Sequence, residues 1–231
     1  MMKYEILLFD ADGTLLDFDA GEAVALKDTF AKFNLPYADR TLAVYRANNH
    51  KQWLLFEQGK KDKQQVLFDR FTDTFVELSI NADVDTVAHY FQKQLGLQCQ
   101  LYEDTVEVLD YFKGKVDMYL VSNGVLATQQ SRMSKSGLDK YFTASFISEY
   151  IGYAKPSKQY FDYCFDHIAN FERSKTLIIG DSLSADIKGG IDNGIDTCWV
   201  NRHGQCSGEI HPTYEIASLK ELYKIVENTS E

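Results

Sequence analysis

The stretch YEILLFDADGTLLDF, residues 4–18, decides the fold. It opens with the apolar run YEILLF, which is typical of a parallel strand buried on both faces. The run stops at Asp10, and Asp12, Gly13 and Thr14 follow at once. Ligands of parallel sheets bind beyond the carboxyl ends of the strands, so this strand end is the first place where the sequence predicts a site.

The rest of the chain divides into two regions of different character. Residues 18–97 contain four helical stretches and no strand-like alternation, which predicts an inserted all-helical domain. Residues 98–231 alternate between strand and helix and join residues 1–17 in one α/β core, which predicts a doubly wound parallel sheet. The expected helices of the insert lie near residues 20–33, 39–58, 62–79 and 83–95. The expected later elements of the core are strands at 116–121, 144–147, 175–179 and 197–200, and helices over 125–136, from Ser157, from Ser184 and over 218–226.

Composition and charge narrow the class of protein. The formal net charge of −10 disfavours a nucleic-acid polymer as a partner, because such partners usually meet a basic patch. A small phosphorylated substrate stays compatible, since a few local cations and a metal can hold one phosphate. No apolar run approaches the roughly 18 residues of a membrane span. The four cysteines form no C-x-x-C pair, which indicates reduced thiols. We expect a cytoplasmic protein without a membrane partner, as a monomer or homodimer.

Polar side chains follow three of the predicted strands. Asp10 and Asp12 follow the first, Ser122 comes at the end of the second, and Asp181 follows a later one. Because the carboxyl ends of parallel strands meet at one edge of a sheet, we expect these side chains to lie close together. Lys155 lies in a loop before a predicted helix and can reach the same edge.

These residue types suit a metal and a phosphate, although each has a plainer interpretation. Clustered carboxylates raise one another's pKa unless a cation lies between them, and oxygen ligands beside a phosphate favour Mg²⁺. Alternatively, the Asp-x-Asp pair is a turn or helix cap, the Ser-Asn-Gly sequence at 122–124 is a turn, and Lys155 is a solvated surface charge. Asp186 either begins a helix or orients Lys155 or a metal-bound water.

As an ordered set, these segments resemble the four signatures of the haloacid dehalogenase (HAD) superfamily. The signatures are Asp10-Ala-Asp12-Gly-Thr14, Ser122, Lys155, and Gly180-Asp181-x-x-x-x-Asp186. The resemblance implies an HAD-like Rossmannoid core. It also implies that the helical insert at residues 18–97 is a cap domain that sets substrate specificity.

The resemblance implies a role for each signature residue. Asp10 is the nucleophile and a metal ligand. Asp12 is the general acid and then the general base, and its backbone carbonyl binds the metal. Asp181 completes the ligands to Mg²⁺, for which Mn²⁺ or Co²⁺ can substitute. Ser122 and Lys155 are the other catalytic residues. The implied phosphate-binding set is Thr14, Ser122, Asn123, Gly124 and Lys155, with Asp186 in support.

A closer resemblance runs over nearly the whole chain, to the pyrimidine 5′-nucleotidases of the YjjG/YfnB type. It implies hydrolysis of pyrimidine nucleoside monophosphates, including non-canonical ones. One departure is Gln52, because an apolar residue is expected before Trp53. The matching stretches are FDADGTLLDF (9–18), Asn49 with Trp53 and Gly59 in the cap, SGLDKYF (136–142), ISEYIGYAKPSKQYFDY (147–163) and GDSLSADIKGGIDNGIDTCWVN (180–201).

Within the cap, Phe18, Asn49, Trp53 and Phe56 are the candidates for contacting a base or sugar, since an aromatic ring can stack on a base. Aromatic residues at helical spacing could instead pack the cap's own core.

Three other activities stay open: a phosphatase of small sugar phosphates or phosphoglycolate, a sugar phosphomutase, and a non-catalytic HAD-fold binding protein. Thr14 favours a phosphatase, because the mutases tend to have valine there. The filled catalytic positions disfavour a non-catalytic role.

Overall fold

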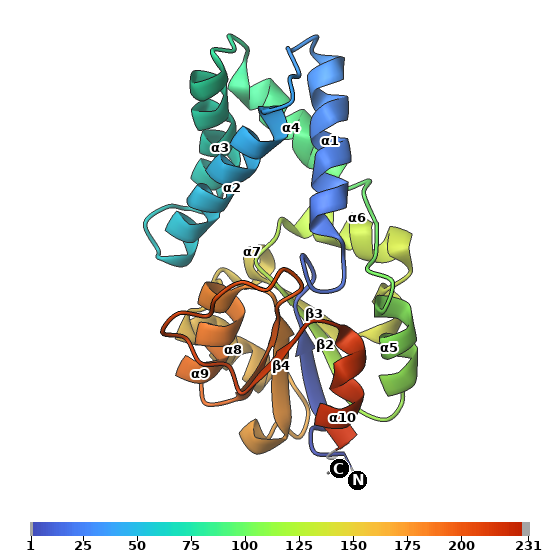
Figure 1. Ribbon diagram of the computed structural model, residues 1–231. Coiled ribbons are helices and arrows are strands. Elements are labelled where there is room, and N and C mark those ends of the chain that lie inside the picture. Colours follow the sequence, from blue (N-terminus) through green and yellow to red (C-terminus); the bar gives the residue numbers. More distant parts are fainter. Residues whose placement is uncertain (1, 228–231) are drawn as a thin grey trace. The chain divides into compact units, whose positions relative to one another are not determined.

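A computed structural model describes residues 2–227 of the chain (Figure 1). The described residues form one six-stranded parallel sheet in the order β3-β2-β1-β4-β5-β6. Since β1 lies at the centre, between β2 and β4, the sheet grows outward in both directions from it, and the predicted doubly wound α/β fold is confirmed. The strands are β1 (Ile6–Phe9), β2 (Asp117–Ser122), β3 (Ala144–Ile147), β4 (Thr176–Gly180), β5 (Asp196–Val200) and β6 (Tyr214–Ile216).

Helices cover both faces of this sheet. Within residues 2–227, no helix combines the length and the apolar character that crossing a membrane requires. The helices of the sheet-bearing part are α5 (Thr105–Phe112), α6 (Leu126–Ser136), α7 (Ser148–Ile151), α8 (Lys158–Asp166), α9 (Lys188–Asp192) and α10 (Leu222–Glu227).

Alternate residues of β1 point into two different cores, because side chains of a strand alternate between its faces. Leu7 and Phe9 pack with residues of α5 and α10. Ile6 and Leu8 pack with residues of α8 on the other face. All four side chains are buried, which explains why this strand is an uninterrupted apolar run in the sequence.

Some short elements were not predicted. Strand β6 has three residues and helix α7 has four, and neither is long enough to show a hydrophobic period. The helix expected from Ser184 begins as a π-helical turn, η3 (Leu183–Ile187), which leads into α9.

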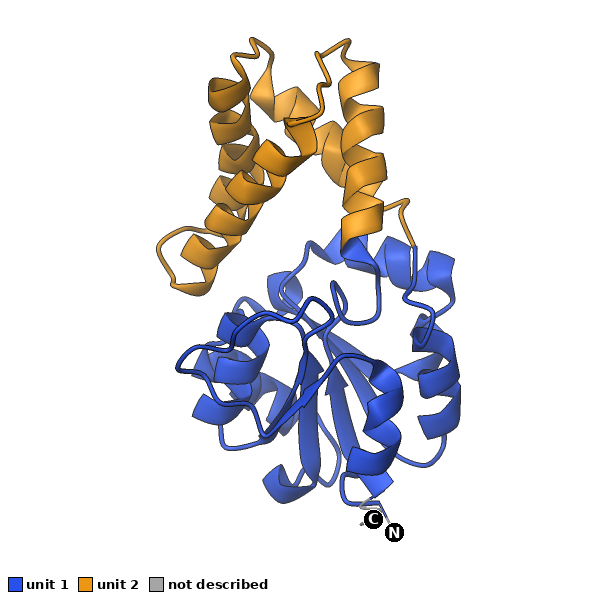
Figure 2. Cartoon of the chain, viewed as in Figure 1, with its two compact units in different colours: residues 1–18, 100–231 blue, residues 19–99 orange. Residues whose placement is uncertain are grey.

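The chain divides into two compact units (Figure 2). Unit 1 consists of residues 1–18 and 100–231, and unit 2 consists of residues 19–99. An aromatic core holds unit 2 together: the ring of Phe71 lies 5.1 Å from Tyr45 and 5.2 Å from Phe91. The helices in this part of the chain are α1 (Phe18–Lys32), α2 (Thr41–Glu57), α3 (Lys63–Leu78) and α4 (Val84–Leu95).

Candidate active site

The polar residues singled out in the sequence meet at the carboxyl edge of the sheet. Asp10 follows β1, Ser122 ends β2 and Asp181 follows β4. These three strands are neighbours in the sheet, so the backbone alone brings their ends together. Lys155 comes from the segment between α7 and α8, and its amino group reaches the same place.

Lys155 is buried and fully engaged. Its Nζ donates to Asp10 Oδ1 at 2.7 Å, to Asp186 Oδ1 at 2.6 Å and to the backbone oxygen of Val121 at 2.9 Å. Burial by itself would lower the pKa of Lys155, but the two carboxylates outweigh it and raise the pKa. The ammonium therefore stays charged, and Lys155 is a buried cation rather than a solvated surface charge.

Asp10 is a buried carboxylate in a crowded electrostatic environment. Removal from water raises its pKa to about 7; Lys155 opposes this rise, and the negative charges of Asp186 and Asp12 add to it. A cation beside Asp10 would favour its charged form. That form is the one able to attack an electrophilic phosphorus atom.

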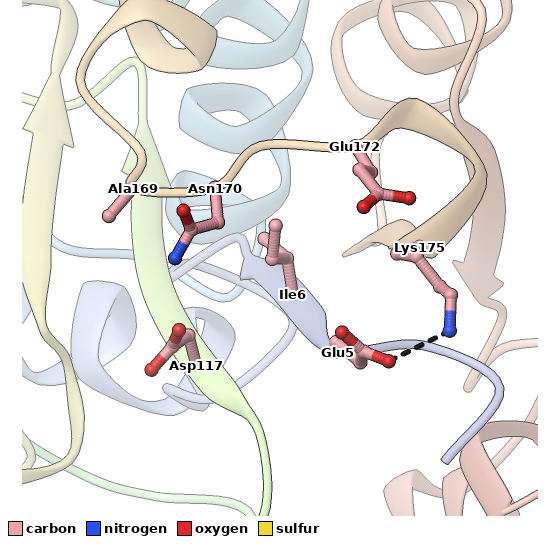
Figure 3. Close-up of a pocket in the computed structure, with 7 residues that line it drawn as sticks. All are labelled: Glu5, Ile6, Asp117, Ala169, Asn170, Glu172 and Lys175. Atoms are coloured by element: carbon pink, nitrogen blue, oxygen red, sulfur yellow. Dashed lines mark hydrogen bonds and ion pairs between the residues drawn. The ribbon is translucent and has the colours of Figure 1, made fainter.

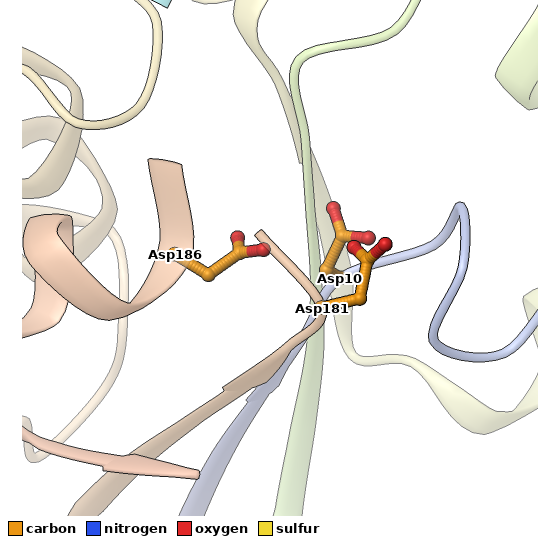
Figure 4. A group of neighbouring side chains, drawn as sticks. All are labelled: Asp10, Asp181 and Asp186. Carbon is orange, nitrogen blue, oxygen red and sulfur yellow. The ribbon is translucent and has the colours of Figure 1, made fainter. Parts of the chain in front are cut away.

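Carboxylate oxygens of Asp10, Asp181 and Asp186 lie within 4.8 Å of one another (Figure 4). The pKa of Asp181 is raised well above its usual value, by loss of contact with water and by the negative charges of Asp10 and Asp186. Because Asp181 keeps an exposed surface, the repulsion between carboxylates is the firmer cause. A divalent cation would relieve this repulsion, and an all-oxygen donor set fits Mg²⁺.

Asp186 differs from the other two carboxylates in its partners. One of its oxygens accepts from Lys155, and the other accepts from the backbone N–H of Ser182 at 3.1 Å. Both oxygens are therefore used within the protein. Asp186 is therefore held between Lys155 and Ser182, and Asp10 and Asp181 are the two carboxylates that could more readily hold a metal.

Two glycines allow the carboxylates to pack against the backbone. A Cβ atom at Gly13 would lie 2.2 Å from Asp181 Oδ2, and the φ angle of Gly13 is +80°. A Cβ atom at Gly180 would lie 2.3 Å from Asp186 Cγ. Any larger residue at either position would displace a carboxylate. Glycine is therefore required at both positions for steric reasons.

The Ser-Asn-Gly sequence after β2 does more than turn the chain. Ser122 Oγ accepts from the backbone N–H of Gly124 at 3.0 Å. The side chain of Asn123 accepts from the Lys155 backbone N–H and donates to the Lys155 backbone oxygen, both at 2.9 Å. This reciprocal pair positions Lys155, so a direct contact of the Asn123 side chain with phosphate stays a prediction.

Thr14 is fully buried. Its hydroxyl has no hydrogen-bond partner among the residues that the structure describes. The backbone oxygen of Thr14 accepts from Arg202 at 3.4 Å, which ties the turn after β1 to the segment after β5. Binding of phosphate by the Thr14 hydroxyl likewise stays a prediction.

The side chain of Asp12 accepts hydrogen bonds from two buried residues, Gln129 and Arg132, which the sequence analysis did not predict. Its Oδ2 accepts from Gln129 Nε2 at 2.6 Å, and its Oδ1 accepts from Arg132. Gln129 also donates to Ser122 Oγ at 2.9 Å. The signal was present in α6, where two polar residues three positions apart occupy the buried face of the helix.

The family of the chain follows from a comparison with known proteins. Residues 4–194 match the family model of the haloacid dehalogenase-like hydrolases. The chain belongs to this family. The expected HAD membership is thereby confirmed, and this HAD hydrolase carries all four signatures at the sheet edge described above.

Several relatives of this HAD hydrolase match over nearly their full length. The HAD-hydrolase YfnB of Bacillus subtilis is 42% identical over 99% of both chains. The pyrimidine 5′-nucleotidase PynA of Streptococcus pneumoniae is 37% identical, covering 96% of this chain and 94% of PynA. The pyrimidine 5′-nucleotidase YjjG of Escherichia coli is 32% identical, covering 97% of this chain and 99% of YjjG.

A solved structure supports the fold of the HAD hydrolase. The crystal structure of B. subtilis YfnB bound to magnesium has a TM-score of 0.93 and covers 96% of this chain and 98% of YfnB. That structure reveals interdomain movement in YfnB.

The candidate substrate residues of the HAD hydrolase outside its signatures have different environments. Asn49 is buried: its amide donates to Glu22 Oε1 and accepts from Arg70, each at 3.2 Å. Trp53 and Phe56 form a half-buried edge-to-face pair with ring centroids 5.5 Å apart. Asn49 thus bonds within the interior of unit 2, while the aromatic pair keeps part of its surface exposed.

Phe18 has a different place from the other three candidates. It is the first residue of α1 but belongs to unit 1. Its ring lies 5.8 Å from the guanidinium carbon of Arg132. Phe18 therefore lies beside Arg132, which donates to Asp12, and a contact with substrate stays a prediction.

Gln52, the departure from the expected pattern, is a buried residue of α2 that is satisfied within unit 2. It donates to Asp73 at 2.8 Å and accepts from Lys61 at 2.5 Å. The polar side chain therefore joins α2 to α3 and to the segment between them.

A pocket at the opposite end of the sheet is unsuited to phosphate (Figure 3). It lies where β1, β2 and β4 begin. Lys175 is the lysine in its lining, and this lysine already pairs with Glu5 at 2.7 Å. Its acidic lining would repel an anion. The lining residues are Glu5, Ile6, Asp117, Ala169, Asn170, Glu172 and Lys175.

Proposed function

We propose that this HAD hydrolase is a Mg²⁺-dependent phosphomonoesterase that acts through an aspartyl phosphate on Asp10, with pyrimidine nucleoside 5′-monophosphates as substrates. The arrangement around Asp10 carries the proposal. A buried lysine contacts one oxygen of Asp10, a second carboxylate lies beside it, and Asp12 is two residues away. Catalysis of phosphoryl transfer depends mainly on positioning the reacting groups and on stabilising charge, and this arrangement of charged groups suits both needs.

In the first step, an Asp10 oxygen would bond to phosphorus as the bond from phosphorus to the ester oxygen breaks. The leaving oxygen would take the carboxyl proton of Asp12, which gives the free alcohol and an Asp12 carboxylate. In the second step, a water oxygen would bond to phosphorus as the bond to Asp10 breaks. Asp12 would take the proton of that water, and inorganic phosphate would leave.

Three other groups would stabilise the negative charge of the phosphoryl oxygens. Lys155 contributes positive charge. Ser122 Oγ accepts hydrogen bonds from Gly124 and Gln129, and its own hydrogen could donate to an anionic oxygen. When bound at Asp10 and Asp181, Mg²⁺ would neutralise charge on the nucleophile and the phosphoryl group. The backbone carbonyl of Asp12 is the further ligand that we propose, and Mn²⁺ or Co²⁺ should substitute.

The proposed substrate class rests on the relatives and on unit 2. PynA and YjjG are both pyrimidine 5′-nucleotidases and match nearly the whole chain, unit 2 included. The half-buried pair of Trp53 and Phe56 offers an aromatic surface of the kind on which bases stack. We therefore assign substrate specificity to unit 2.

A panel of phosphate esters tests the proposal. With Mg²⁺ present, we expect phosphate release from dUMP, dTMP and UMP to exceed release from sugar phosphates and phosphoglycolate. Chelation of Mg²⁺ with EDTA should abolish release, and added Mg²⁺ should restore it. Good release from sugar phosphates with none from the nucleotides would reject the nucleotidase. Isomer formation without free phosphate would indicate a mutase, and no turnover of any ester would indicate a binding protein.

Replacing Trp53 with alanine should reduce kcat/KM for a pyrimidine nucleotide by about 5- to 150-fold, since a stacked base contributes roughly 1–3 kcal/mol. Turnover of a small ester without a base, such as phenyl phosphate, should change little. Phe68→Ala is a matched control, because Phe68 is an exposed aromatic residue on α3 of the same unit. Equal losses on both esters would count against base recognition by Trp53.

A further inference from the structure

We propose that Gln129 and Arg132 are positioning residues that hold Asp12 toward the leaving oxygen and couple it to Ser122. This inference rests on the proposed phosphatase function and adds two residues to its machinery. Both residues are on α6, which begins just after the strand end that carries Ser122. Sequence signatures assign neither of them a role.

The amide of Gln129 bridges the two halves of the site. Its nitrogen donates to Asp12 Oδ2 at 2.6 Å and to Ser122 Oγ at 2.9 Å, while its oxygen accepts from Arg132 at 3.4 Å. Because the guanidinium has only donors, it fixes which way the amide is turned. One side chain thus connects the acid–base carboxylate with the hydroxyl that would hold phosphate.

Burial makes this arrangement rigid. The side chains of Gln129 and Arg132 are each only 1% exposed. A Cβ atom at Gly124 would lie 2.6 Å from Gln129 Nε2, so the turn after β2 closes directly over the amide. A buried group that is hydrogen-bonded on several sides has few alternative rotamers, which is what holding a catalytic carboxylate requires.

Asp12 itself is still open to a substrate. Its side chain is 30% exposed, whereas that of its partner Arg132 is 1% exposed. The two donors therefore approach Asp12 from the protein side and leave another side free. When Asp12 gives its proton to an ester oxygen it becomes a carboxylate, and both donors are already placed to bond to that form.

The chemistry of the leaving group separates this role from a structural one. An alkoxide leaving group needs a proton from Asp12, whereas p-nitrophenolate leaves readily without one. A variant that misplaces Asp12 should therefore lose activity on alkyl esters and keep it on p-nitrophenyl phosphate. The ratio kcat/KM is the quantity to compare, because it reports the steps up to release of the alcohol or phenol.

The experiment uses the full chain with Mg²⁺, p-nitrophenyl phosphate, and the alkyl ester that the wild type hydrolyses fastest. Arg132→Met should lower kcat/KM for the alkyl ester by about 100-fold and for p-nitrophenyl phosphate by less than about 3-fold, since general acid catalysis contributes roughly 10²–10⁴-fold. Arg132→Lys, which keeps the charge, should recover part of the loss. Gln129→Leu is a milder change that serves as a second test if Arg132→Met folds poorly. It should likewise lose more activity on the alkyl ester than on p-nitrophenyl phosphate.

Lys135→Met is the matched control, because it removes an exposed cation from the same helix, and it should change neither rate. Equal losses on the two esters in the Arg132 and Gln129 variants would overturn the inference, as would full activity on the alkyl ester. A wild type that hydrolyses neither ester would instead reject the proposed function and the inference with it.

Discussion

Asp10→Asn should abolish phosphate release from every ester, with kcat lower by at least about 10⁴-fold, the scale on which removal of a nucleophile acts. The amide is nearly the same size as the carboxylate but cannot form the acyl phosphate. Lys155 keeps its contact with Asp186, so the protein should still fold. Phosphate release at saturating substrate measures the effect, and acid-quenched samples of the wild type should contain phosphate bound to Asp10.

Asp166→Asn is the control for this substitution, because Asp166 is an exposed aspartate at the end of α8. It should retain wild-type turnover. Substantial activity in the Asp10→Asn protein would remove the nucleophile from the proposed mechanism, and with it the aspartyl phosphate.

Lys155→Met should lower both activity and stability. Removal of the ammonium leaves Asp10 and Asp186 without their shared cation, and breaking a buried ion pair costs about 3–5 kcal/mol. We expect kcat/KM to fall by roughly 10²–10³-fold, because the positive charge that contacts Asp10 is lost. Urea unfolding and ester kinetics measure the two effects. Added Mg²⁺ should recover part of the stability, since it compensates the same carboxylates.

The control is Lys158→Met, three residues further along the chain. Lys158 is exposed and pairs with Asp162 within α8. Surface pairs of this kind contribute little, so its loss should leave kinetics and unfolding nearly unchanged. A Lys155→Met protein as stable and as active as Lys158→Met would contradict the role assigned to Lys155.

Strand-end residues were the part of the site most readily predicted from sequence. Asp10, Ser122 and Asp181 each come directly at or after a buried apolar run, and parallel strands bring such positions to one edge. Lys155 was harder, because a lysine in a loop usually lies in solvent. Its place among the signatures of a known family, and not its local sequence, identified it.

The partners of these residues could not be predicted in the same way. Asn49 was a candidate for contacting substrate, but its amide bridges Glu22 and Arg70 inside unit 2. Asn123 was a candidate for binding phosphate, but its side chain is paired with the backbone of Lys155. An amide can bond to many groups, and a sequence does not state which of them lies within reach.

The amino-acid sequence by itself determined the α/β class, the helical insert and the strand ends that carry Asp10, Ser122 and Asp181. These follow from hydrophobic period and strand ends, which are properties of consecutive residues. Only the tertiary structure decided that Gln129 and Arg132 meet Asp12, across separations of 117 and 120 positions. Such contacts depend on how the segment after β1 packs against α6, and no pattern of neighbouring residues in the sequence specifies that packing.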